Sequence, residues 1–147
     1  MNDVSPSARR NWMSTLSTSA PGRLAALLPD LPDHALLRSP EIGAVMVRGR
    51  AGATGAAFNL GEMTVTRCSV RLQDGVVGHA WVQGRDKDHA RRAAVVDGLM
   101  QTDRADYIRQ TILAPLAAEA LAARRSRAEK AAATKVDFFT MVRGEDR

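Results

Sequence analysis

The fold of this chain is decided by Met63-Thr-Val-Thr-Arg-Cys-Ser-Val-Arg-Leu72, Gln73-Asp-Gly75 and Val76-Val-Gly-His-Ala-Trp-Val-Gln83. Apolar and polar residues alternate on both sides of the central Asp-Gly pair, which is the pattern of a β-hairpin. Asp-Gly favours a two-residue type I′ turn, because both central positions of that turn need positive φ. The sequence therefore predicts two antiparallel strands joined at Asp74-Gly75.

The two-residue turn also predicts which residues share a face of the hairpin. The expected core face holds three pairs: Leu72 with Val77, Val70 with His79, and Cys68 with Trp81. The opposite face is expected to be flat, small and basic, with Arg67, Ser69 and Arg71 facing Val82, Ala80 and Gly78.

The flanking segments predict an α+β fold, with helices, then a run of strands, then helices. Residues 7–38 have helical spacing, with Trp12 and Leu16 on one face and a stripe at Leu24, Leu27 and Leu28. Residues 41–84, with recurrent glycines between β-branched runs, predict an antiparallel meander of three to four strands. Residues 86–132 predict two to three helices, in which Asp86 is the N-cap and Pro115 a break or kink.

The totals fit one domain of 147 residues, with 45% hydrophobic and 25% charged residues. A lone cysteine, Cys68, excludes an intrachain disulfide and suits a reducing compartment. No apolar run is long enough for a membrane span, and the first residues lack the layout of a secretion signal. We expect a cytoplasmic protein.

The net charge of +5 invites a phosphate or nucleic-acid partner. An arginine-rich surface with no such partner explains the same charge, and we favour that reading. The basic run Arg124-Arg-Ser-Arg127 has no interleaved aromatic residue to stack bases. Nucleic-acid binding is therefore the less favoured alternative.

The ligand-binding candidates are Arg48, Arg50, His79 and Arg85. Arg48 directly precedes Gly49-Arg-Ala-Gly-Ala-Thr-Gly55, and Arg50 is its second residue. This segment lacks the Lys-Ser/Thr of a P-loop and is better interpreted as a hairpin connection. Arg85 lies at a strand-to-helix junction, where it can contact an anion or pair with Glu62 or Asp88.

Catalytic and metal chemistry find little support in the sequence. A catalytic nucleophile–base pair of Cys68 and His79 would need an acidic residue to orient the histidine, and the sequence places none beside them. We therefore favour the interpretation that Cys68 is a buried structural residue. His34, His79 and His89 lack the spacing of metal ligands. We expect no catalytic residue, no metal and no cofactor in this chain.

Residues 133–147 contain two of the three phenylalanines of the chain. Apolar residues in a chain end that should otherwise be polar must dock somewhere. We predict an extended docking tail in which Phe138, Phe139, Met141 and Arg143 contact this domain or a partner.

Several segments together resemble the PhnG family, subunits of the bacterial carbon–phosphorus lyase core complex. They are Asn11-Trp-Met-Ser14, Arg48-Gly-Arg-Ala-Gly-Ala-Thr-Gly55, Gly61-Glu-Met-Thr-Val-Thr-Arg-Cys68, Asp74-Gly75, Gly78-His79, Gly84-Arg-Asp-Lys-Asp-His-Ala90 and Lys135-Val-Asp-Phe-Phe-Thr-Met-Val-Arg-Gly-Glu-Asp146. The resemblance runs nearly end to end, and the last segment is its most specific part.

The resemblance implies a role in phosphonate breakdown under phosphate limitation, alongside PhnI, PhnH, PhnL and PhnJ. That set displaces adenine from ATP and joins methylphosphonate to the ribose, with PhnI regarded as carrying the chemistry. It implies that this chain is a non-catalytic subunit of a transferase, closest to PhnI. The isolated chain can also form a homodimer, because surface meant for a partner can pair with itself. A stand-alone enzyme or binding protein for a phosphorylated ligand is the alternative.

Overall fold

A computed structural model describes residues 5–135, so Phe138, Phe139, Met141 and Arg143 lie outside the described residues. The sheet is antiparallel in the order β1-β2-β3, with β1 at His34–Arg50, β2 at Ala57–Leu72 and β3 at Val77–Gln83. Helices α1 (Pro6–Thr18) and α2 (Pro21–Leu27) precede it, and α3 (Lys87–Leu99), α4 (Ala105–Ile108) and α5 (Ala114–Ala133) follow it. The α+β prediction is confirmed.

The predicted helical region, 7–38, extends too far. α2 ends at Leu27, and residues 34–38 already belong to β1. Pro29 and Pro32 stand between the two elements, and the residue before a proline disfavours helical φ and ψ. Leu24 itself is fully buried, and Leu27 and Leu28 pack against the core, so the predicted apolar stripe is confirmed.

The predicted register of the β2–β3 hairpin is wrong by one residue. The backbone N–H of Leu72 donates to the carbonyl oxygen of Val76 at 2.9 Å, so the loop has three residues, and Gly75 adopts a φ of 87°. Cys68 therefore pairs with Ala80 and Arg67 with Trp81. Because side chains alternate along a strand, this slip turns the whole of β3 over.

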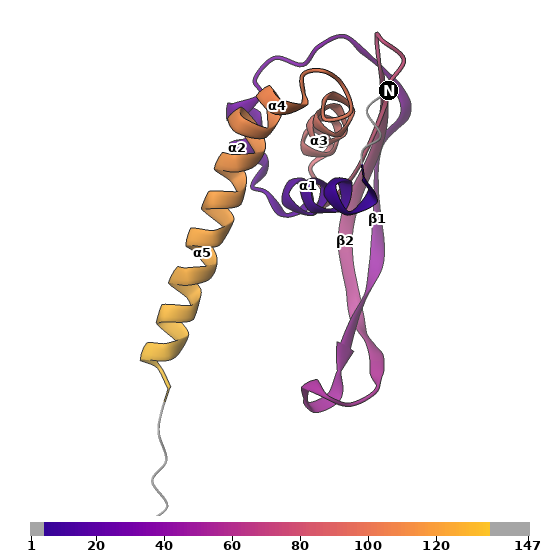
Figure 1. Ribbon diagram of the computed structural model, residues 1–147. Helices are drawn as coiled ribbons and strands as arrows, with labels where there is room; N and C mark the ends of the chain where they lie inside the picture. Colours follow the sequence, from indigo (N-terminus) through magenta and orange to yellow (C-terminus); the bar gives the residue numbers. More distant parts are fainter. Residues whose placement is uncertain (1–4, 136–147) are drawn as a thin grey trace, which may run out of the picture.

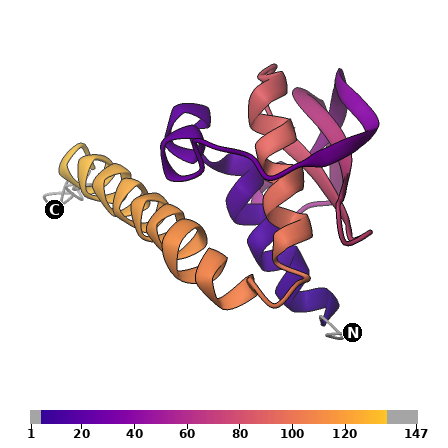
Figure 2. The same cartoon turned by 90° about the horizontal axis from the view of Figure 1, so that it is seen from above.

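The core lies between the sheet and α3 (Figures 1 and 2). Cys68, Val70 and Leu72 of β2 face it as predicted, while β3 contributes Gly78, Ala80 and Val82 in place of His79 and Trp81. The buried stripe of α3 is built from the expected small and aliphatic residues, which are Ala90, Ala93, Ala94, Val96, Leu99 and Met100. Asp86 caps the helix by accepting the N–H of His89 at 2.8 Å, also as predicted.

β3 and α3 approach closely at Gly78. A Cβ placed on Gly78 would overlap the carbonyl oxygen of Ala94 and would lie 2.6 Å from the backbone nitrogen of Gly98. Only glycine at position 78 allows this contact between backbones. The small stripe of α3 and the small inner face of β3 therefore fit each other.

Pro115 does not end the C-terminal helix. Helical backbone continues from α4 through a π-helical turn at Arg109–Leu113 into α5. The N–H of Ala114 bonds to the carbonyl of Arg109, five residues back. Proline has no N–H, and the wider turn just before it absorbs the change in hydrogen bonding. Of the predicted break or kink at Pro115, the break is wrong, because a local π-helical turn keeps the helix continuous.

Two elements project from the body (Figure 1). One is the distal part of the β1–β2 hairpin, residues 42–64, which we call the hairpin arm; its tip holds a short 3₁₀ turn at Ala51–Ala53. The other is α5, in which Leu116 is the buried residue. None of the helices within residues 5–135 is both long enough and apolar enough to cross a membrane.

Candidate functional site on the sheet

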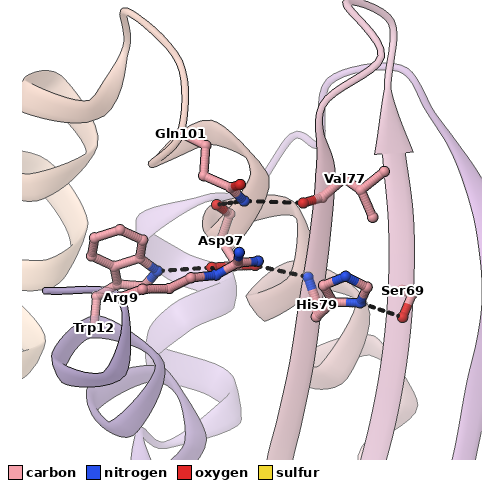
Figure 3. Close-up of polar contacts among 7 residues, drawn as sticks. All are labelled: Arg9, Trp12, Ser69, Val77, His79, Asp97 and Gln101. Atoms are coloured by element: carbon pink, nitrogen blue, oxygen red, sulfur yellow. Dashed lines mark hydrogen bonds and ion pairs between the residues drawn. The ribbon is translucent and has the colours of Figure 1, made fainter. Parts of the chain in front are cut away.

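Asp97 of α3 joins three elements in a buried polar cluster (Figure 3). Its carboxylate accepts hydrogen bonds from Arg9 Nε at 3.1 Å and Arg9 Nη2 at 2.6 Å, both from α1. It also accepts the indole N–H of Trp12 at 2.9 Å and the backbone N–H of His79 at 2.8 Å. The side chain of Asp97 is fully buried, so these donors replace its hydration.

The cluster closes part of the free edge of β3. The outer edge of a sheet presents unpaired N–H and C=O groups. Asp97 accepts the outward N–H of His79, and the side-chain amide of Gln101 donates to the carbonyl of Val77 at 3.0 Å. The same amide donates to the carbonyl of Asp97 at 2.9 Å. These side chains hold the start of β3 against α3 and fix the position of His79.

The face of the sheet turned away from α3 carries polar and basic side chains. Ser69 Oγ and His79 Nδ1 are hydrogen bonded at 2.8 Å (Figure 3). Next along the same face, the guanidinium of Arg67 lies 5.6 Å from the centre of the Trp81 ring. Trp81 is 48% exposed, so this cation–π contact faces solvent. The basic β2 half of this face, predicted from Arg67, Ser69 and Arg71, is therefore present. Its β3 half carries the side chains of His79 and Trp81 in place of the small residues that were predicted.

Glu41 of β1 completes this face. Its carboxylate accepts hydrogen bonds from Arg38 and Arg67, both at 3.0 Å. These hydrogen bonds, and the charge of Arg67, lower the pKa of Glu41. The side chains of all three residues remain at least 40% exposed, so the cluster orients the arginines more than it stabilises the fold.

The Ser69–His79 pair is not a catalytic triad. A triad needs an acid on the second ring nitrogen of the histidine, whereas Asp97 holds the backbone N–H of His79. Cys68 faces the opposite side of the sheet, where it is 2% exposed and donates to the carbonyl of Arg38 at 3.4 Å. Burial raises the pKa of the Cys68 thiol. The hypothetical Cys68–His79 pair therefore does not form.

The remaining ligand-binding candidates lie on other elements. Arg48 and Arg50 are at the distal end of the hairpin arm, where Arg50 Nη1 donates to the carbonyl of Gly55 at 3.2 Å. The glycine-rich segment Gly49–Gly55 ends β1 and forms the connection to β2, as expected. Arg85 follows β3 in the turn before α3 and forms no hydrogen bond or ion pair with any residue between 5 and 135, while Asp88 bonds to Arg92 at 2.6 Å.

His89 is a buried group of α3 outside this face. Its Nε2 lies 3.1 Å from the Ser19 hydroxyl, and burial lowers the pKa of the ring despite the nearby carboxylate of Asp86. Over the described part of the chain, no three His, Cys, Asp or Glu side chains come together as a metal site would require.

The sequence reasoning missed Asp97, Gln101 and Arg9. Asp97 could have been found, because it follows Ala93 and Ala94 at the helical spacing of the buried stripe. An acid on an apolar helix face needs donors from neighbouring elements. Arg9 and Trp12 lie within one turn of each other on α1 and supply them.

Comparison with known proteins identifies the family. Residues 7–144 match the family described as "Phosphonate metabolism protein PhnG". A curated relative from Rhizobium meliloti (strain 1021), named "Alpha-D-ribose 1-methylphosphonate 5-triphosphate synthase subunit PhnG", is 45% identical over 148 aligned positions. The alignment covers 99% of this chain and 95% of the relative. The chain therefore belongs to the PhnG family of phosphonate metabolism proteins.

Proposed function

We propose that this chain is a positioning subunit that carries no catalytic residue of its own. It is a subunit of the ribose methylphosphonate triphosphate synthase in phosphonate metabolism. The match over nearly the whole of both chains is the observation that carries this function. Three of the proposed partners, PhnI, PhnH and PhnL, belong to the synthase, with PhnI as the closest neighbour; PhnJ joins the core complex for the later cleavage of the carbon–phosphorus bond.

The described residues support the positioning role. Within these residues, the polar clusters are built as structural clusters are. The Asp97 carboxylate is saturated by donors from two other elements, α1 and β3, and the Ser69–His79 pair has no acidic group to orient the histidine. At the same time, a hairpin arm and a long exposed helix project from a small core. A subunit that aligns its neighbours needs such projecting surface more than it needs a pocket.

Co-expression with the other synthase subunits tests the assignment. The tagged chain should retain them on an affinity column, and the assembly should release adenine when supplied with ATP and methylphosphonate. The isolated chain should release none. A chain that retains no other subunit would contradict the proposed function.

The same assay discriminates the alternative of a stand-alone enzyme acting through the basic face. Adenine release by the pure chain, abolished by His79→Ala or Arg85→Ala, would favour that alternative over the positioning role.

A further inference from the structure

The segment Ile42–Val47 of β1 carries no charged residue, although within residues 5–135 its strand pairs on one side only. Ile42 is 39% exposed and Met46 is 54% exposed. A solvated hairpin normally has one polar face, whereas an unbroken apolar run is typical of strands buried on both faces. This segment therefore has the sequence of an interior strand, although it lies at the edge of the sheet.

The hydrogen-bonding pattern shows which backbone groups are unpaired. Leu72 N–H bonds to Val76 C=O and Gly84 N–H bonds to Thr64 C=O, so the even-numbered residues of β2 bond toward β3. The odd-numbered residues of β2 therefore bond toward β1. Their partners there include Gly43 opposite Val65 and Val45 opposite Met63.

It follows that Ile42, Ala44 and Met46 point their N–H and C=O groups away from β2. None of the helices in the described part of the chain covers these residues, which are all exposed. Figure 1 shows the distal part of the hairpin standing clear of the helices. A long, uncharged, apolar edge strand is a ready template for pairing with another strand. At the start of β3 the fold covers the edge with Asp97 and Gln101, whereas along Ile42–Met46 of β1 the described residues supply no such cover.

We propose that the free edge at Ile42, Ala44 and Met46 pairs with an extended strand of another subunit of the synthase, which continues the sheet. Main-chain hydrogen bonds of this kind give affinity, and side chains beside the strand give specificity. Exposed Arg48 and Arg50 lie just beyond the segment, so the partner presents acidic groups there. This inference rests on the proposed function, because it takes the occupant from the same assembly.

A second copy of this chain fits the edge less well. The two-fold symmetry of a homodimer would pair the two segments antiparallel. With the axis at Ala44, counting outward places Arg50 of one copy opposite Arg38 of the other. Each copy also carries a net charge of +5, which opposes self-association.

Ala44→Pro in the co-expressed assembly is the first test. Proline removes the outward N–H and is tolerated at the outer side of an edge strand. We expect the variant to bind the other subunits about tenfold more weakly or worse. Ala44→Val retains the N–H and should bind as the wild type does, and a melting curve of each isolated variant establishes that it folds.

Met46→Lys is a second variant that leaves the backbone intact, with Met46→Leu as its control. A charge beside the pairing strand should release the other subunits, as charges do on natural sheet edges. Normal retention of both Ala44→Pro and Met46→Lys, alongside normal retention of the wild type, would overturn this inference and leave the proposed function standing. Failure of the wild type to retain any subunit would overturn both.

Hydrogen–deuterium exchange with residue resolution supplies a signature that a loosely packed interface would not give. In the assembly, the amides of Ile42, Ala44 and Met46 should exchange at least about tenfold more slowly than in the isolated chain. The amides of Gly43 and Val45, already bonded to β2, should change less. Equal exchange of the even-numbered amides in both states would overturn the proposal, as would their protection in an isolated chain that sediments as a dimer.

Discussion

Replacing Asp97 with alanine should destabilise the isolated chain by about 3–5 kcal/mol. The substitution leaves two donors, the indole N–H of Trp12 and the backbone N–H of His79, without an acceptor. Each buried donor left unpaired costs about 1–3 kcal/mol. Arg9 adds less, because its side chain is 32% exposed and recovers water, so its ion pair contributes about 1 kcal/mol.

Urea denaturation of the isolated chain measures this loss, with an unchanged slope as the sign that the unfolded state is the same. Asp106→Ala is the matched control, because Asp106 also pairs with an arginine at 2.7 Å but its side chain is 86% exposed. The control should cost under about 1 kcal/mol. Asp97→Asn keeps the shape but places an amide N–H₂ against a donor, and should fall between the two. If Asp97→Ala costs no more than Asp106→Ala, the cluster does not hold α1, α3 and β3 together.

Three further results are expected. Gly78→Ala should lower the free energy of unfolding by about 2–3 kcal/mol, because its Cβ would overlap the backbone of α3. Gly61→Ala is the control and should have little effect, since no atom lies within 4 Å of a Cβ there. Equal losses of stability in the two variants would exclude the close contact at Gly78. The buried His89 has a lowered pKa, so its contribution is fully present above about pH 6.5 and is lost as the pH falls below it. Melting temperature should therefore fall on acidification, and less steeply in His89→Gln; identical profiles would refute the assignment to His89. Deleting residues 136–147, which include Phe138 and Phe139, should reduce either the melting temperature or the retention of partner subunits, since burying two phenylalanines contributes about 3–6 kcal/mol. A truncated chain that behaves normally in both assays would refute a docking role for the tail.

Sequence reasoning succeeded where local pattern and packing agree. The stripe of α3 and the inward residues of β2, such as Cys68 and Val70, follow from periodicity alone and are confirmed. Helix starts were equally accessible, since Asp86 is an N-cap by residue type and is one in the structure. These features need no information from distant parts of the chain.

The register of β3 could not be read from the turn. Asp74-Gly75 can close a two-residue loop, or a three-residue loop in which the glycine alone has positive φ, and the local sequence does not choose between them. Packing against α3 determines the loop length and the register. Gly78 must face the helix, because no side chain fits beside Ala94 and Gly98. That contact joins residues distant in the chain, and it sends His79 and Trp81 to the outer face.

The candidate site was only partly predictable for the same reason. The basic residues of β2 were found, but their partners on β3 depended on the register. Asp97 was overlooked because its donors come from α1 and β3, far from it in the sequence. The unpaired edge of β1 became visible only once the strand order placed β1 at the outside of the sheet.

Native mass spectrometry of the co-expressed assembly tests most directly the claim that this chain works as a subunit through its free sheet edge. The tagged wild-type chain and the Ala44→Val variant should appear bound to other subunits of the synthase, while Ala44→Pro should appear mainly alone and folded. A wild-type chain found alone would contradict its role as a subunit. Wild type and Ala44→Pro in equal amounts of the same assembly would contradict the role of the edge.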